Sequence, residues 1–75
     1  MKQMTKKKDI NTGTKQLLAQ IDQNVGIITL NRPESRNALS DELTPALRNT
    51  IKEFDTNREV RSLLITGAGK AFCAG

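Results

Sequence analysis

The 75-residue sequence is poor in aromatic residues, cysteine and histidine, and each shortage excludes a class of protein. Phe54 and Phe72 are the only aromatic residues, so the chain lacks the aromatic side chains on which single-stranded nucleic acids stack. A single cysteine, Cys73, excludes an internal disulfide framework and a cysteine-rich zinc site. Because histidine is absent as well, we expect a cytoplasmic protein with no metal of its own.

Long apolar runs are also missing. No segment approaches the roughly 20 apolar residues that a membrane span needs. The amino terminus has neither the apolar stretch of a secretory signal nor the arginine-rich pattern of a transit peptide. We therefore expect no membrane partner. The length allows at most one small domain, and Gly75 directly follows a loop that should lead into another element, which suggests the amino-terminal part of a longer protein.

All of the net charge lies in residues 1–15. They contain five lysines and one aspartate, whereas residues 16–75 contain seven basic and seven acidic side chains. A lysine run can bind nucleic acid, but this one has no aromatic residue beside it and no apolar face. We therefore predict a basic disordered tail over residues 1–15, no nucleic-acid partner, and a folded domain over residues 16–75.

Two apolar runs, residues 15–22 and 25–30, predict two strands. Polar residues and glycine between them predict a hairpin whose turn lies just before Val25. Gly26, inside the second run, suggests a bulge. Pro33 lacks an N–H group for the ladder and should end the second strand in a polar loop.

The next segment predicts an amphipathic helix, because apolar residues recur there every three or four positions. These residues are Leu39, Leu43, Leu47, Ile51 and Phe54, with Ala46 beside them. Two starts are possible. Either Ser40 caps the helix and its first turn is irregular around Pro45, or Thr44 caps a helix that begins at Pro45.

The last apolar run, residues 63–66, predicts a strand buried on both faces, followed by a loop of small residues. A helix between this strand and residues 25–30 should make the two strands parallel neighbours with a right-handed crossover. The loops over residues 31–38 and 67–75 then leave the same edge of the sheet, where a ligand could lie between them. The spacing matches neither a phosphate-binding P-loop nor a dinucleotide fingerprint, because Ala71 and Phe72 occupy positions that need a hydroxyl and a glycine.

Three motifs in order carry a resemblance to a known family. They are VGIITLNRP from Val25, RNAL from Arg36, and LITG from Leu64 with KAFCAG from Lys70. Together they resemble the opening of the enoyl-CoA hydratase/isomerase (crotonase) family over residues 17–75. The resemblance implies an α/β fold, namely an amino-terminal β-hairpin plus a βαβ unit of the ClpP/crotonase type.

The resemblance also implies a function, most simply hydration of 2-enoyl-CoA thioesters, with an enoyl-CoA isomerase as the alternative. In this family an acyl-CoA lies across the two loops, so the CoA-binding residues would be Arg36, Asn37, Ala38, Phe72, Ala74 and Gly75. Coenzyme A would be part of the substrate, no separate cofactor would be needed, and the intact enzyme would be a homotrimer or hexamer. Backbone N–H groups would form an oxyanion hole. One of them would belong to the residue that follows Gly75.

No residue of the chain matches a catalytic position of the family. Glu34, Asp41, Glu42 and Glu53 are expected in a solvated loop and on helix faces. Arg36 could pair with a CoA phosphate or be solvated, and Lys70 has the same two interpretations. Cys73 has no histidine to activate it and is expected to be a buried small residue. A different class also stays open, that of a non-catalytic interaction module that uses its basic tail.

Overall fold

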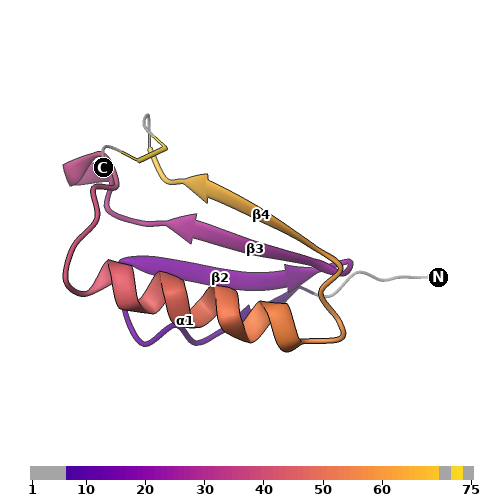
Figure 1. Cartoon of the computed structure of the whole chain (residues 1–75). Coiled ribbons are helices and arrows are strands. Elements are labelled where there is room, and N and C mark those ends of the chain that lie inside the picture. The colour runs from indigo at the N-terminus through magenta and orange to yellow at the C-terminus, as the bar shows by residue number, and fades with distance from the viewer. Residues whose placement is uncertain (1–6, 70–71, 74–75) are drawn as a thin grey trace.

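The computed structural model of the chain describes residues 7–69 and 72–73, which form a four-stranded sheet with a helix on one face (Figure 1). The strand order is β1-β2-β3-β4, with antiparallel pairing up to β3 and parallel pairing between β3 and β4. The predicted hairpin and βαβ unit are therefore confirmed. The elements are β1 Lys8–Ile10, β2 Leu17–Asp22, β3 Val25–Leu30, the short 3-10 helix η1 Pro33–Ser35, α1 Leu43–Thr56 and β4 Ser62–Gly67.

The hairpin turn lies where the sequence predicted it. Gln23 and Asn24 join β2 to β3 with φ values of 52° and 70°. Positive φ at both central residues is typical of the type I′ turn, whose twist matches that of the flanking strands. The pairing then runs without interruption from Asp22 and Val25 to Leu17 and Leu30. This register places alternate β2 and β3 side chains beneath α1.

Gly26 does not form the predicted bulge, since it pairs with Ile21 in the unbroken ladder. It provides space instead. A Cβ atom at this position would lie 2.7 Å from Cδ2 of Phe54 and 2.9 Å from Cδ2 of Leu63. The aromatic ring of α1 therefore packs directly on the β3 backbone, and this contact explains the glycine.

Replacing Gly26 with alanine should lower the free energy of unfolding by about 1–3 kcal/mol, the usual cost of overpacking a well-filled core. Chemical denaturation of the variant and the wild type would measure this loss in the free energy of unfolding. Adding Phe54→Leu should make the double variant less destabilised than the sum of the two single changes, because the smaller side chain leaves room for the new methyl group. If the losses of the two single variants simply added up in the double variant, the alanine methyl group at position 26 would not be in contact with the Phe54 ring.

The prediction of disorder throughout residues 1–15 is wrong for Lys8–Ile10, which form β1 and pair with residues 19–21 of β2. Lys8 and Asp9 are charged and exposed, as the residues of a solvated tail would be. Ile10, however, packs against the core, and the strand backbone pairs with β2. The Thr12 hydroxyl also donates to the Leu17 carbonyl oxygen at 2.6 Å and ties the connection to β2.

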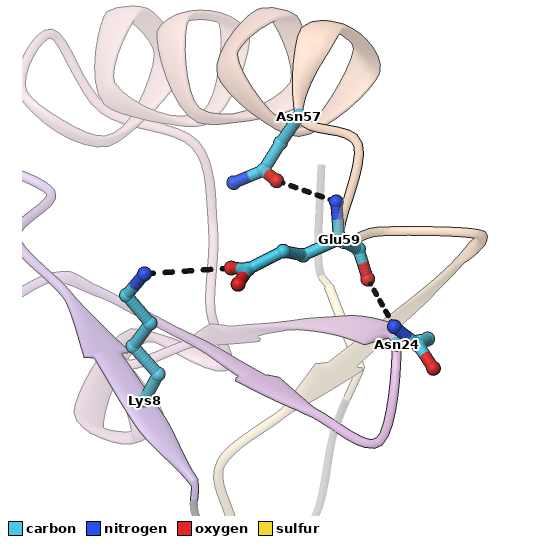
Figure 2. Close-up of polar contacts among 4 residues, drawn as sticks. All are labelled: Lys8, Asn24, Asn57 and Glu59. Atoms are coloured by element: carbon cyan, nitrogen blue, oxygen red, sulfur yellow. Dashed lines mark hydrogen bonds and ion pairs between the residues drawn. The ribbon is translucent and has the colours of Figure 1, made fainter.

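Polar contacts close the end of the sheet at which the hairpin turn lies (Figure 2). Lys8 Nζ lies 3.4 Å from Glu59 Oε1, and the Asn24 side-chain amide donates to the Glu59 carbonyl oxygen at 2.9 Å. The Glu59 N–H donates to Asn57 Oδ1 at 2.8 Å. Both partners of the ion pair are more than half exposed, so its contribution to stability is small. The contacts nevertheless connect β1, the hairpin turn and the segment before β4.

Helix α1 begins at Leu43, and Glu42 stands at its N-cap position without a side-chain capping bond. Ser40 Oγ accepts the Leu43 N–H at 2.9 Å. Pro45 is then the third residue of the helix, within the first turn, where N–H groups have few intrahelical acceptors. The predicted start at Pro45 with a Thr44 cap is therefore wrong. Of the first predicted start, the Ser40 hydrogen bond is present, but the helix begins two residues later than a cap at Ser40 implies. No helix in the described part of the chain is long and apolar enough to cross a membrane.

The core lies between α1 and the covered face of the sheet. Leu39 was predicted to share the apolar stripe, but it precedes the helix and is 47% exposed. Thr50, which the apolar pattern omits, is buried instead. The buried apolar residues are Leu17, Ala19, Ile21, Ile28, Leu30, Leu43, Ala46 and Phe54.

Strand β4 is not buried on both faces as predicted. Leu63, Leu64 and Ile65 are 42%, 52% and 36% exposed. The physical reason is position, because β4 is the outer strand of the sheet and α1 packs against β2. In the described part of the chain, β4 is thus an apolar edge strand.

Candidate functional site

Two loops leave the carboxyl ends of the parallel strands β3 and β4, at the end of the sheet opposite the hairpin turn (Figure 1). We call residues 31–38 the β3 loop and residues 68–73 the β4 loop, of which residues 70–71 lie outside the described part. The carboxyl ends of parallel strands are where open α/β sheets bind ligands. The two loops therefore form the candidate site.

The β3 loop is folded tightly on itself. After η1, Arg36 and Asn37 both adopt left-handed backbone conformations, with φ values of 52° and 59°. The Asn37 N–H donates to the Arg32 carbonyl oxygen at 2.7 Å, and the Arg32 N–H donates to Asn37 Oδ1 at 2.7 Å. The Arg32 guanidinium also donates to the Ala38 carbonyl oxygen. The backbone after β3 is thus closed into a turn whose ends are Arg32 and Ala38.

Asn37 also joins the two loops. Its side chain is fully buried, and Nδ2 donates to the Ala68 carbonyl oxygen at 2.8 Å. The Ala68 N–H donates to the Leu30 carbonyl oxygen at 2.8 Å. A Cβ atom at Gly69, whose φ is 82°, would lie 3.0 Å from Cβ of Pro33. The two loops are therefore in contact at their base, as the predicted parallel pairing required.

The predicted CoA-binding residues fall into three groups. Asn37 is buried between the loops, and Ala38 is half-buried beside it. Arg36 and Phe72 are exposed. Ala74 and Gly75 lie outside the described residues. The fold thus brings Asn37 of the β3 loop to the β4 loop and leaves Arg36 accessible to a ligand, while CoA contact itself stays a prediction.

Other residues weighed from the sequence occupy unremarkable positions. Cys73 was expected to be buried, but it is a half-buried free thiol that packs against the core. Glu34, Asp41, Glu42 and Glu53 are all exposed. Lys70 lies outside the described residues.

The sequence prediction missed the connection that the Asn37 side chain makes between the loops. A signal was present, because asparagine is enriched several-fold at positive φ and its short amide can bond to nearby backbone. An asparagine directly before Ala38 in a proline-containing loop was therefore a candidate turn residue as well as a candidate ligand contact.

The model of the family described as enoyl-CoA hydratase/isomerase matches residues 20–75. A probable enoyl-CoA hydratase of Mycobacterium tuberculosis is 44% identical over 59 residues, which are 79% of this chain and 23% of that protein. The 1,2-epoxyphenylacetyl-CoA isomerase of Escherichia coli is 41% identical over 59 residues, which are 79% of this chain and 22% of that protein. The chain thus spans about a quarter of the length of these relatives.

Solved structures agree with the sequence relatives. An enoyl-CoA hydratase from Mycobacterium tuberculosis superposes with a TM-score of 0.79 at 38% identity, covering 81% of this chain and 28% of that one. A carnitinyl-CoA dehydratase from Mycobacterium avium superposes with a TM-score of 0.77 at 41% identity, covering 83% and 25%. The predicted crotonase-type fold is confirmed. With a family model over most of its length and a matching arrangement of strands, helix and loops, the chain belongs to the enoyl-CoA hydratase/isomerase family.

Proposed function

We propose that the chain is the acyl-CoA-binding part of an enoyl-CoA hydratase, with an acyl-CoA thioester held across the β3 and β4 loops. The observation that carries the proposal is the contact between these loops at the carboxyl ends of β3 and β4, where Asn37 Nδ2 meets the Ala68 carbonyl oxygen at 2.8 Å. Relatives and solved structures named as enoyl-CoA hydratases support it.

The reaction would be an addition without redox change. The oxygen of water forms a bond to C3 of the 2-enoyl thioester, a proton is added at C2, and the 2,3 double bond becomes a single bond. Negative charge builds on the thioester oxygen in between, and backbone N–H groups stabilise it. The role of this chain would be to bind and orient the thioester. None of its carboxylates is assigned a proton transfer, and coenzyme A enters only as part of the substrate.

An isomerase of the same family is the second candidate. One observation supports it, namely that the family model that matches residues 20–75 is described as enoyl-CoA hydratase/isomerase. Moving a double bond from C3 to C2 passes through the same kind of enolate and needs the same oxyanion stabilisation. It differs in that no water is consumed.

Two substrates separate these candidates when assayed on the full polypeptide that carries this sequence. A hydratase removes the absorbance of the conjugated 2-enoyl thioester, whereas an isomerase creates it from a 3-enoyl-CoA. Turnover of the first substrate alone supports the hydratase. Turnover of the second alone supports the isomerase, and turnover of neither would overturn the proposed function.

Replacing Arg36 with alanine should raise KM about fivefold with kcat unchanged, since about 1 kcal/mol is the upper range for an exposed ion pair. The reason is that exposed Arg36 would pair with a phosphate of CoA, far from the reacting carbons. Steady-state kinetics at low and high salt would test this, because the effect should shrink as salt screens the pair.

Arg58→Ala is the matched control for this prediction. Arg58 is also exposed, but it lies in the connection between α1 and β4, next to Glu59 at the hairpin-turn end of the sheet. Its replacement should leave KM unchanged. An equal rise in KM in both variants would mean that the effect comes from the general loss of positive charge. An unchanged KM in both variants would mean that Arg36 is solvated and does not pair with CoA.

We also propose a cytoplasmic protein that forms a homotrimer or hexamer. The single cysteine, a free thiol, supports the reducing compartment. The oligomer follows from the family resemblance. Sedimentation of the full polypeptide would test it, and a monomer that turns over acyl-CoA would contradict it.

A further inference from the structure

We propose that Asn37 is a positioning residue whose side-chain amide sets the spacing between the β3 and β4 loops, and so the affinity for acyl-CoA, without touching the ligand. The inference rests on the proposed function. It replaces the direct CoA contact expected of Asn37 with a role between the loops, because the side chain is fully buried. Three observations carry it, namely the backbone of Asn37, the partners of its amide and the state of Ala68.

The backbone and the amide of Asn37 act together. Asn37 has a φ of 59°, in the left-handed region, and its side chain reaches the backbone of both loops. There Oδ1 accepts the Arg32 N–H at 2.7 Å, while Nδ2 donates to the Ala68 carbonyl oxygen at 2.8 Å. One amide thus holds the start of the β3 loop with its acceptor and the β4 loop with its donor. Because the side chain is fully buried, water cannot replace these bonds without opening the contact.

Ala68 is held on both sides as a result. Its N–H donates to the last residue of β3, the Leu30 carbonyl oxygen, at 2.8 Å, and its carbonyl oxygen accepts from Asn37. The peptide after β4 therefore has a fixed direction before the chain turns at Gly69, which lies against Pro33. Phe72 and Cys73, the described residues of the β4 loop beyond Gly69, follow this fixed point. Their distance from Arg36 and Ala38 would therefore depend on Asn37.

A purely structural role for Asn37 gives a different expectation. Loss of stability lowers the fraction of folded enzyme, and with it the apparent kcat, but leaves KM unchanged. Loss of spacing weakens a binding surface shared by substrate and transition state, which raises KM at constant kcat per folded molecule. The two roles are therefore separable by kinetics.

The chain contains a matched control at the other end of the sheet. Asn24 also has a positive φ, 70°, and its Nδ2 also donates to a distant backbone oxygen, that of Glu59 at 2.9 Å (Figure 2). It differs from Asn37 in being exposed and in lying at the hairpin turn, away from both loops. Glycine adopts positive φ without strain, so an Asn→Gly change at either position removes the amide and keeps the backbone.

The test compares Asn37→Gly and Asn24→Gly in the full polypeptide, with KM and kcat for a 2-enoyl-CoA and the folded fraction from circular dichroism. We expect Asn37→Gly to raise KM about tenfold, equivalent to about 1.4 kcal/mol, with kcat per folded molecule within about twofold of wild type. Asn24→Gly should leave KM unchanged. Direct titration with a saturated acyl-CoA, which binds without reacting, should show the same tenfold difference in Kd.

Every other result overturns the proposal. An unchanged KM in Asn37→Gly would make Asn37 a stability residue only. If that variant does not fold, Asn37→Asp replaces it, since it keeps an oxygen that accepts the Arg32 N–H and puts a carboxylate oxygen in the place of the Nδ2 donor to Ala68. Failure of both to fold would also assign Asn37 to stability. An inactive wild type that binds no acyl-CoA would overturn the proposed function itself, whereas an active wild type with unaffected variants would overturn only this inference.

Discussion

Replacing Phe54 with alanine should lower the free energy of unfolding by about 3–5 kcal/mol, the usual range for removing a buried aromatic side chain. Phe54 is the largest fully buried side chain among the described residues, and its ring fills the space above Gly26 between α1, β3 and β4. A folded unit of this size has only about 4–11 kcal/mol in total, at 0.05–0.15 kcal/mol per residue. The variant should therefore be largely unfolded at denaturant concentrations at which the wild type is still folded, as circular dichroism would show.

Leu39→Ala is the control for Phe54→Ala, because the apolar periodicity assigns both residues to one stripe. Leu39 is 47% exposed and precedes the helix. Its replacement should change the free energy of unfolding by no more than about 0.5 kcal/mol, as is usual for surface positions. Equal losses from the two changes would mean that Leu39 is buried under native conditions and that the packing described for α1 is wrong.

Local signals in the sequence were sufficient for the hairpin, the helix and the parallel pairing. The polar turn before Val25, the spacing of Leu43, Ala46 and Phe54, and the glycines at the end of β4 each depend on the physics of a few neighbouring residues. The meeting of the two loops followed from topology alone. Once α1 connects β3 to β4 in parallel, both loops must leave the same end of the sheet.

The features that sequence reasoning missed depend on contacts between distant residues. Strand β1 is stabilised by pairing with β2. The lysine-rich composition of residues 1–15 gives no indication of this pairing. Gly26 is explained by Phe54, which lies 28 positions away in the printed sequence. The Asn37 amide bonds to Ala68, 31 residues later. Such contacts cannot be predicted from periodicity, because neither partner changes the local pattern of the other.

The two edges of the sheet differ, and the difference predicts how the 75-residue polypeptide behaves on its own. The β1 edge carries the exposed charges of Lys8 and Asp9, which discourage pairing with another chain. The β4 edge in the described part of the chain carries exposed Leu63, Leu64 and Ile65 beside backbone groups that have no neighbouring strand. We therefore expect the isolated polypeptide to self-associate through β4, as concentration-dependent light scattering would show.

Leu64→Lys should raise the concentration at which the isolated polypeptide associates by at least about tenfold, equivalent to about 1.4 kcal/mol, because a lysine on an edge strand opposes pairing of its backbone with another chain. Leu18→Lys is the matched control. Leu18 is 49% exposed, close to the 52% of Leu64, and the register places both on the sheet face away from α1, but Leu18 lies on the inner strand β2. If association occurred by stacking of apolar faces, both changes would suppress it equally. Association through the β4 edge requires that Leu64→Lys suppress it strongly and Leu18→Lys weakly.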